Sequence, residues 1–286
     1  MAAPGKLFVV ATPLGNLEDM TLRAQRILGE VDLVAAEDTR HTRRLLQHFG
    51  IRARLTSYYD QVEERRAGPL VAAMLEGKRV ALVSDAGTPC IADPGYRLVR
   101  AAAAAGVAVE VVPGACAVAA ALSISGLPTD RFAFEGFVPA RSAARDRFLA
   151  ALAGETRTLV LYETARRLAA TLAALRDTWG DREIVVCREL TKLHEESLRG
   201  TVSAVADELA ERAGELPGEL VLVVAGAAAS APALDTEGIR GELRRLRADG
   251  MSLRDAARRV AAEHQLARNE VYRIGVEMGA DGDPGD

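Results

Sequence analysis

Residues 79–89 read Arg-Val-Ala-Leu-Val-Ser-Asp-Ala-Gly-Thr-Pro and join a short apolar run to a loop of small and polar residues. The run Arg79–Ser84 has charge before it and Gly and Pro after it, a pattern that predicts a buried strand. Ligands of open α/β sheets bind just outside the carboxyl ends of such strands. The stretch therefore predicts a strand and, directly after it, a binding loop.

Similar apolar runs flank this stretch at Lys6–Ala11, Val31–Ala36 and Val107–Val112, with helix-period segments between most of them. Two of these segments, Thr21–Gly29 and Thr39–Phe49, are amphipathic, and each begins with a threonine suited to capping a helix. Alternating strands and helices predict a parallel sheet.

A second set of alternating segments follows a Gly-Leu-Pro-Thr break at residues 126–129 and predicts a second α/β unit. Its strand-like segments are Phe132–Glu135, Thr158–Tyr162, Glu183–Cys187 and Glu219–Ala225, and its helical segments are Ala143–Ala153, Ala165–Trp179 and Val202–Arg212.

A linker of small residues, Ala227–Ala233, leads to a tail of two or three helices, in which Ser252 and Asp255 form a capping pair. The end from Ala280 onward is expected to be disordered. We thus predict an N-terminal α/β domain over residues 1–126, a C-terminal α/β domain over residues 127–230 and a helical appendage over residues 237–279.

Composition excludes several classes of protein. The 286 residues are 49% hydrophobic and 27% charged, as in ordinary globular proteins, and the net charge of −4 argues against a surface covered with positive charge. Three separated cysteines make a disulfide framework or a zinc site improbable. The N-terminal apolar run is too short for a signal peptide, and Pro and Gly interrupt the uncharged stretch Val111–Thr129. We expect a cytoplasmic protein with no metal and no membrane span.

The turn after the first strand contains Pro13 and Gly15 but no G-x-G-x-x-G fingerprint, which disfavours a dinucleotide site. A proline that fixes the chain direction and a glycine that permits close approach suit a tight structural turn and a ligand wall equally well.

Two further turns repeat the arrangement of a strand followed by small residues. The loop Asp85, Ala86, Gly87, Thr88 offers exposed N–H groups with little bulk, although an Asx turn is the alternative. A second rigid turn, Ile91–Gly95, continues this loop. The Gly114, Ala115, Cys116, Ala117 turn opens a helix whose N-terminus favours an anionic group, although close helix packing also explains its small residues. The Cys116 thiol is more typical of an inert buried group than of a nucleophile.

Charge gathers in three segments that each follow a predicted strand: residues 35–44, 162–167 and 188–192. Carboxylates beside Arg or Lys at strand ends can position a phosphate and a general base, whereas salt-bridged, solvated loops are the alternative. His41 and His194 lie in or beside these segments and could contact a substrate.

Taken in order, these motifs resemble those of the ribosomal RNA small subunit methyltransferase I family. The resemblance rests on Pro-Leu-Gly-Asn-Leu, Ala-Ala-Glu-Asp-Thr-Arg, Ser-Asp-Ala-Gly-Thr-Pro, Asp-Pro-Gly-Tyr, the Pro-Gly turn, Tyr-Glu and Arg-Glu-Leu-Thr-Lys-Leu-His-Glu-Glu, and spans Lys6–Met278. It implies the tetrapyrrole-methylase fold, with S-adenosylmethionine between two α/β domains, and a homodimer. It also implies 2′-O-methylation of a cytidine in the decoding region of 16S rRNA.

The sequence departs from the family pattern at four places. Ala165-Arg166-Arg167 stands where many relatives have Pro-His-Arg, and Ala115-Cys116 stands within their Pro-Gly-Pro-Ser. Residues 58–63 replace a His-rich stretch, and residues 217–219 replace Lys-Gly-Glu. None of these departures removes the Asp85 loop.

Methyl transfer to a ribose hydroxyl is an in-line displacement, so alignment in a cleft that excludes water supplies much of the catalysis, and a base assists. The residues that the motifs and the resemblance nominate fall into two sets. The catalytic candidates, unranked, are Glu37, Asp38, Arg40, Glu163, Glu189 and Lys192, of which Arg40 and Lys192 would hold phosphates. The cofactor-binding candidates are Pro13, Gly15, Asp85, Ala86, Gly87, Thr88, Gly114, Ala115, Cys116, Ala117 and Tyr162.

Two other functions stay open from the sequence. One is methylation of a tetrapyrrole or corrinoid precursor. The other is a non-catalytic nucleic-acid-binding regulator, because residues 251–278 resemble a helix-turn-helix. The segment Arg240–Arg273 carries nine Arg against five acids, which suits either a nucleic-acid-facing appendage or a solvated helical cap.

Overall fold

The computed structural model describes residues 5–212, 218–228, 235–264 and 266–280. The chain divides into two compact units, Met1–Ala227 and Ala228–Asp286. Most of the linker expected at Ala227–Ala233, and residues 281–286 of the expected disordered end, lie outside the described residues. No described helix is long and apolar enough to cross a membrane. The predicted domain boundaries at residues 126 and 230 stay predictions.

The first sheet is parallel throughout, as the sequence predicts. Its strand order is β3-β2-β4-β1-β5. The strands are β1 (Lys6–Val10), β2 (Leu33–Ala36), β3 (Leu55–Ser57), β4 (Arg79–Val83) and β5 (Ala108–Val112). Because all five strands run the same way, the loops that follow β1, β2, β4 and β5 meet at one edge of the sheet.

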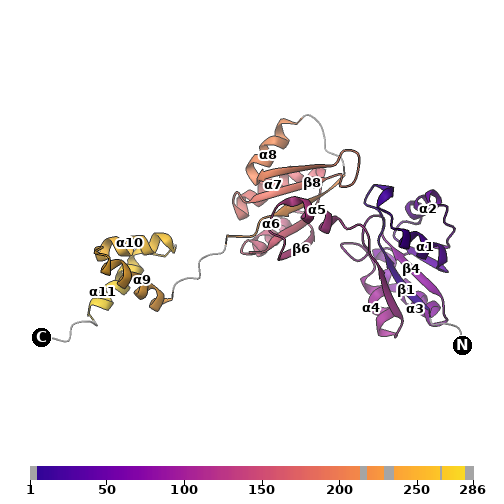
Figure 1. Ribbon diagram of the computed structural model, residues 1–286, viewed down its shortest axis with the longest axis horizontal. Helices are drawn as coiled ribbons and strands as arrows, with labels where there is room; N and C mark the ends of the chain where they lie inside the picture. The colour runs from indigo at the N-terminus through magenta and orange to yellow at the C-terminus, as the bar shows by residue number, and fades with distance from the viewer. Residues whose placement is uncertain (1–4, 213–217, 229–234, 265, 281–286) are drawn as a thin grey trace. The chain divides into compact units, whose positions relative to one another are not determined.

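Helices cover both faces of this sheet (Figure 1). On one face α1 (Leu22–Glu30) and α2 (Thr39–His48) pack with buried side chains such as Ile27 and Leu46. On the other face α3 (Asp60–Leu75) and α4 (Tyr96–Ala104) pack through Met74 and Leu98. The apolar stripes of these helices are what hold the loops at the carboxyl edge in fixed positions.

The second sheet is mixed. Its order is β6-β7-β10-β8-β9, with β6 and β7 parallel and the other pairs antiparallel. The strands are β6 (Phe132–Phe137), β7 (Thr158–Thr164), β8 (Glu183–Arg188), β9 (Glu196–Thr201) and β10 (Glu219–Val224).

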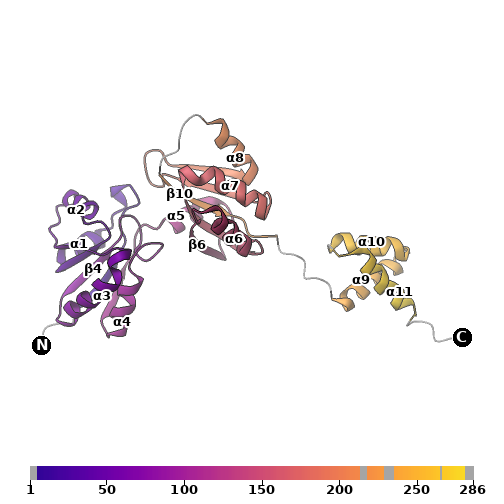
Figure 2. The same cartoon turned by 180° about the vertical axis from the view of Figure 1, so that it is seen from behind.

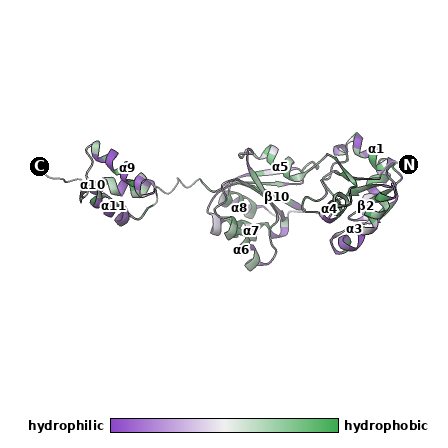
Figure 3. Ribbon diagram, turned by 90° about the horizontal axis from the view of Figure 1, so that it is seen from below, coloured by the Kyte–Doolittle hydropathy of each residue, from purple (hydrophilic) through white to green (hydrophobic). Residues whose placement is uncertain are grey.

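One face of the second sheet packs against α6 (Ser142–Leu152), α7 (Ala165–Trp179) and α8 (Val202–Glu211), and the other against α5 (Ala117–Ser125) (Figure 2). Figure 3 shows hydrophobic residues gathered along the strands. Because α5 begins directly after β5 of the first sheet and packs on the second sheet, it joins the two sheets.

The unit Ala228–Asp286 contains the helices α9 (Thr236–Ala248), α10 (Leu253–Glu263) and α11 (Arg268–Ala280). Leu243, Val260 and Val271 are fully buried in its core. The side chain of Ser252 accepts a hydrogen bond from the Asp255 N–H, which confirms the predicted capping pair.

The structure corrects several local expectations. The N-cap of α2 is Asp38 rather than Thr39, because the Asp38 carboxylate accepts the Arg40 N–H at 2.7 Å. The sequence reading also missed a short 3-10 helix, one long helix and two strands. These are η1 (Leu17–Asp19), α3, β3 and β9.

Candidate functional site

Hydrogen bonds tie together three loops at the carboxyl edge of the first sheet. Thr12, after β1, and Gly87, after β4, exchange backbone hydrogen bonds of 2.8 and 3.0 Å. The Thr88 hydroxyl donates to the Ala115 carbonyl, after β5, at 3.0 Å. Gly87 has φ of +80°, and a Cβ there would lie 3.1 Å from Leu14. Only glycine fits both this backbone conformation and this close contact.

A fourth loop, after β2, is held by carboxylates. The Asp85 N–H donates to Glu37 Oε2 at 3.2 Å, and the Asp38 N–H donates to Asp85 Oδ1 at 3.0 Å. The Asp38 carboxylate in turn pairs with the Arg40 guanidinium, which lowers the pKa of Asp38 to about 2. Asp85 and Glu37 therefore each hold the backbone of the other's loop.

These loops and the second sheet enclose a cavity of about 500 Å³ within the unit Met1–Ala227. The first sheet contributes loop residues, and β6, β7, β8, β10 and the loops beside them contribute the opposite wall. The lining comprises Leu14, Glu37, Ala86, Gly87, Thr88, Ile91, Ala92, Asp93, Cys116, Ala117, Phe137, Tyr162, Cys187, Glu189, Leu190, Lys192, Gly218, Glu219, Leu220 and Val221.

The described lining is acidic. It holds four carboxylates, from Glu37, Asp93, Glu189 and Glu219, against the single ammonium of Lys192. Burial and the Glu37 charge raise the pKa of Asp93 to about 7, and burial also raises the pKa of Glu37. The cavity therefore favours a positively charged ligand and offers a carboxyl group that gains or loses its proton near neutral pH.

Strained backbone borders the cavity on both sides. The non-glycine residues with positive φ in the described chain are Cys90 and Ala92 in one loop and Glu189 and Thr191 in another. Ala92 and Glu189 themselves line the cavity. Such strain costs about 1–3 kcal/mol each and persists where the surroundings hold it.

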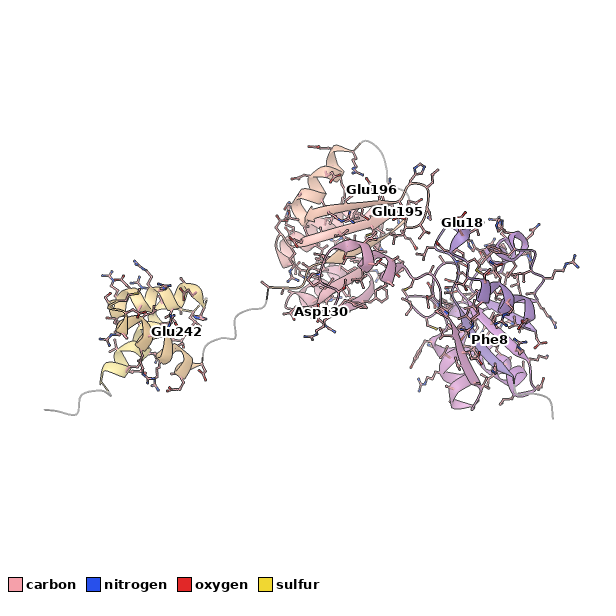
Figure 4. All side chains as sticks on the ribbon, in the orientation of Figure 1. Phe8, Glu18, Asp130, Glu195, Glu196 and Glu242 are labelled. Atoms are coloured by element: carbon pink, nitrogen blue, oxygen red, sulfur yellow. The ribbon has the colours of Figure 1, made fainter. Side chains whose placement is uncertain are left out.

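Buried and bridging carboxylates hold these two loops. Glu63, on α3, accepts the Gly95 N–H at 2.6 Å and so anchors the turn that carries Asp93. Glu195 accepts the Thr191 N–H at 2.6 Å, and Glu196 beside it pairs with Arg188 at 2.6 Å (Figure 4).

Lys192 reaches across to the first sheet's loops. Its Nζ lies 2.9 Å from Glu189 Oε1, and its aliphatic stem occupies the space that a Cβ at Gly15 would need. A Cβ at Gly218 would lie 2.9 Å from the same Glu189 oxygen. Small residues at 15 and 218 thus allow the Glu189–Lys192 pair to lie in the cavity wall.

The structure brings nine of the predicted site residues together in the lining. They are Glu37, Ala86, Gly87, Thr88, Cys116, Ala117, Tyr162, Glu189 and Lys192. Asp85 and Ala115 lie just behind the lining and hold its loops by the hydrogen bonds described above. Pro13, Gly15 and Gly114 are not lining residues, and a Cβ at Gly114 would lie 3.0 Å from Ala11, so this glycine serves close packing.

Three catalytic candidates lie away from the cavity lining: Asp38, Arg40 and Glu163. The Arg40 side chain is 83% exposed on α2. Glu163 is 1% exposed, and its oxygens bind Thr171 Oγ1, the Thr164 N–H and Arg167, each at 2.6 Å. A carboxylate whose oxygens are so occupied holds the start of α7 rather than facing a substrate.

Sequence reasoning missed Asp93, Glu219, Phe137 and Leu190 as lining residues. The sequence predicts the turn Ile91–Gly95, but nothing in it shows that Asp93 lines the cavity together with Glu37. Among the described residues, no group of three or more His, Cys, Asp and Glu side chains has an arrangement that could hold a metal ion.

The fold and this cavity match a known class. The model of the family described as Tetrapyrrole (Corrin/Porphyrin) Methylases matches residues 6–206. A solved structure, the uroporphyrin-III-C-methyltransferase from Thermus thermophilus, is 25% identical, covers 77% of this chain and 94% of its own, and superposes with a TM-score of 0.54. The class defined by fold and site is therefore that of the tetrapyrrole methylases.

Two relatives identify a family within this class. A protein of Synechocystis sp. is 47% identical over 97% of this chain and 100% of its own length. A protein of Escherichia coli O157:H7 is 45% identical over 96% of each chain. Both are named ribosomal RNA small subunit methyltransferase I. The chain belongs to the tetrapyrrole methylase family and, within it, to the ribosomal RNA small subunit methyltransferase I family.

Proposed function

We propose that this protein transfers a methyl group from S-adenosylmethionine to the 2′-hydroxyl of a cytidine ribose in the decoding region of 16S rRNA. The observation that carries the methyl-transfer proposal is the acidic cavity between the loops of the two sheets, lined by the motif residues of the family. The names of the two full-length relatives support small-subunit rRNA as the acceptor. The cytidine and the 2′-hydroxyl come from the resemblance of the motifs.

The residues present fit the proposed cofactor. A volume of about 500 Å³ lies within the 300–1,000 Å³ range typical of small-molecule sites. Ala86, Gly87 and Ala117 leave room for a nucleoside, and Leu190 and Val221 give the cavity an apolar wall. The acidic lining suits a sulfonium and an amino group. When bound, S-adenosylmethionine supplies the electrophilic methyl group.

The ribose hydroxyl is a poor nucleophile while protonated, so a carboxylate that accepts its proton assists the transfer. Glu37, Glu189 and Asp93 line the cavity, whereas Glu163 does not. We assign the proton-accepting role to Asp93, which lines the cavity together with Glu37, because a base works best when its pKa is near the working pH. Lys192, from the cavity wall, and Arg40, from α2, are proposed to hold phosphates next to the target nucleotide.

The proposed partner is 16S rRNA within the small ribosomal subunit, and the protein is proposed to act in the cytoplasm as a homodimer, as the resemblance implies. The role of each site residue is testable by single substitutions. Asp93→Asn and Glu37→Gln should each lower the rate of transfer while cofactor binding persists. Asp130→Asn, an exposed aspartate on the second sheet's side (Figure 4), is the matched control.

A second candidate, methylation of a tetrapyrrole precursor, is favoured by the likeness to the uroporphyrin-III-C-methyltransferase structure. Labelled S-adenosylmethionine is incubated with the protein and, in separate reactions, with small ribosomal subunits, a tetrapyrrole precursor or bare duplex DNA. We expect label in rRNA alone. Label in the tetrapyrrole would replace the proposal by the second candidate, and no label in any acceptor would contradict both.

A further inference from the structure

A continuous stretch of positive charge lies beside the cavity. Residues 39–57 form α2, the following turn and β3, and they contain five Arg and two His but no acid. The protein as a whole has a net charge of −4. This segment is therefore opposite in sign to the molecule that carries it.

Four of these arginines are available to bind a partner molecule. Arg43, Arg44, Arg52 and Arg54 are all exposed, and none of them makes an ion pair with a described carboxylate. Only Arg40 is paired within the segment, with Asp38 at 2.9 Å. Guanidinium groups that no described carboxylate offsets raise the positive potential around this segment.

The exposed side chains of Arg43, Arg44, Arg52 and Arg54 are here called the α2 surface, and two of them, Arg43 and Arg52, border a depression. Leu46, Ile51, Ala53 and Leu55 line a depression of about 700 Å³, with Arg43 and Arg52 beside them. Arginines beside apolar side chains suit single-stranded RNA, whose bases stack on arginine and whose phosphates accept its N–H groups.

The α2 surface runs from the edge of the first sheet that carries the cavity toward the opposite edge. Glu37 lines the cavity, and α2 starts two residues later. The ten residues of α2 extend about 15 Å from that edge. An RNA strand that leaves the cavity along α2 would meet Arg43 and Arg44 first, and then Arg52 and Arg54, which precede β3 at the opposite edge of the sheet.

The charge of the cavity favours a separate site for the phosphates of an RNA acceptor. The described lining has four carboxylates and one ammonium, so it repels the phosphates of an RNA acceptor. The helical unit offers little net positive charge for binding RNA phosphates, because residues 235–280 contain nine Arg against eight acids. Arg245, Arg258 and Arg259 there also pair with acids of their own helices.

We propose that the α2 surface binds the RNA strand on either side of the target nucleotide, with Arg43, Arg44, Arg52 and Arg54 contacting phosphates. This inference rests on the proposed function, because it takes RNA as the acceptor. It assigns RNA binding to the first α/β domain rather than to the C-terminal helices.

The test compares two variants that each lose four charges. The first replaces Arg43, Arg44, Arg52 and Arg54 by Ala. The matched control replaces four exposed arginines that also make no ion pair with a described carboxylate: Arg65, Arg100, Arg131 and Arg147. Binding of small-subunit rRNA and transfer of methyl to small subunits are measured between 50 and 200 mM salt, and cofactor binding is measured by calorimetry.

Each phosphate contact contributes about 0.7 to the slope of log affinity against log salt for a single strand, so four contacts contribute about 2.8. The wild type should therefore lose about 50-fold more affinity across this salt range than the α2-surface variant. The variant should also show a raised KM for small subunits, with cofactor affinity unchanged. The control should behave as the wild type does.

The outcomes separate the inference from the function on which it rests. If the wild type methylates rRNA and the α2-surface variant keeps its salt slope and KM, the α2 surface is not the RNA site, although the function stands. If the wild type transfers no methyl to any RNA, both fail. If the quadruple variant loses cofactor binding, the double variants Arg43→Ala/Arg44→Ala and Arg52→Ala/Arg54→Ala are measured in the same way. Each should show about half the change in the slope of log RNA affinity against log salt.

Discussion

Replacing Asp93 by Asn should change how the stability of the protein depends on pH. Burial, together with the charge of Glu37, raises the pKa of Asp93 from 3.8 to about 7. A carboxyl group whose pKa is raised by folding stabilises the folded state most when it is protonated. Its contribution is therefore fully present below pH 3.8 and is lost as the pH rises to about 7.

The size of the effect follows from the pKa. Each pH unit between the two pKa values corresponds to about 1.36 kcal/mol of stability. The two units from pH 5 to pH 7 therefore bound the loss of stability in that range at about 2.7 kcal/mol. Because Asp93 is only partly buried and shares its repulsion with Glu37, we expect about 1–2 kcal/mol. Asparagine carries no charge, so the variant should gain this amount relative to the wild type between pH 5 and pH 8.

Urea unfolding followed by circular dichroism at pH 5 and pH 8 measures the difference. Asp130→Asn serves as the control, because that aspartate is exposed and its variant should track the wild type at both pH values. The gain in the free energy of unfolding of Asp93→Asn over the wild type should be larger at pH 8 than at pH 5. If the gain were equal at the two pH values, or larger at pH 5, the conclusion that burial raises the pKa of Asp93 would be wrong.

Four further predictions follow from the site. Binding of S-adenosylmethionine at pH 7 should release up to about half a proton, because a bound cation lowers the pKa of Asp93. Calorimetry in buffers of different ionisation heat measures the number of protons released. Equal release on binding of S-adenosylhomocysteine, whose sulfur is uncharged, would contradict this prediction. Asp85→Ala should weaken cofactor binding by about 1–3 kcal/mol, since the Asp38 N–H loses its partner, and an unchanged affinity in a folded variant would refute the loop's role. Arg40→Ala or Lys192→Ala should weaken RNA binding and spare the cofactor; the reverse pattern would show that the assignment is wrong. Deleting the chain from Glu237 onward should reduce the salt dependence of RNA affinity less than replacing the four α2-surface arginines does, because the C-terminal helices are nearly neutral. An equal reduction would assign an RNA-binding role to the C-terminal helices.

The first sheet was predictable because its strands are short apolar runs separated by amphipathic segments, and a parallel sheet requires helices between strands. The second sheet was predictable only as an α/β unit. Its runs at β7, β8 and β10 are equally apolar, and nothing in their composition distinguishes antiparallel from parallel pairing.

The elements that the sequence reading missed have identifiable physical reasons. β3 has only three residues, and β9, Glu-Ser-Leu-Arg-Gly-Thr, lies at the edge of its sheet and is mostly polar. The helix α3 contains Gly68 and Pro69, which are read as helix breakers in a sequence. At the start of α2, Asp38 and Thr39 are both good N-caps, and the choice between them depends on where the β2 loop is held.

Only part of the site was predictable from the sequence, because local patterns do not show which tertiary contacts a residue makes. Gly87 and the small residues after it mark a loop that approaches a ligand, whereas the roles of acidic residues depend on tertiary contacts. Glu163 and Glu189 each follow a strand in a charged motif, yet Glu163 is buried against Thr171 and Arg167 while Glu189 faces the cavity. Asp93 gains its raised pKa only because folding buries it beside Glu37.

The central claim is methyl transfer to the 2′-hydroxyl of a cytidine in small-subunit rRNA. The most direct measurement is nucleoside mass spectrometry of rRNA from small subunits that lack the modification, after incubation with the protein and isotopically labelled S-adenosylmethionine. The account predicts one labelled 2′-O-methylcytidine per subunit, at a decoding-region position, formed more slowly by the Asp93→Asn variant but not by Asp130→Asn. Label on a base, on another nucleoside or on no RNA at all would contradict it.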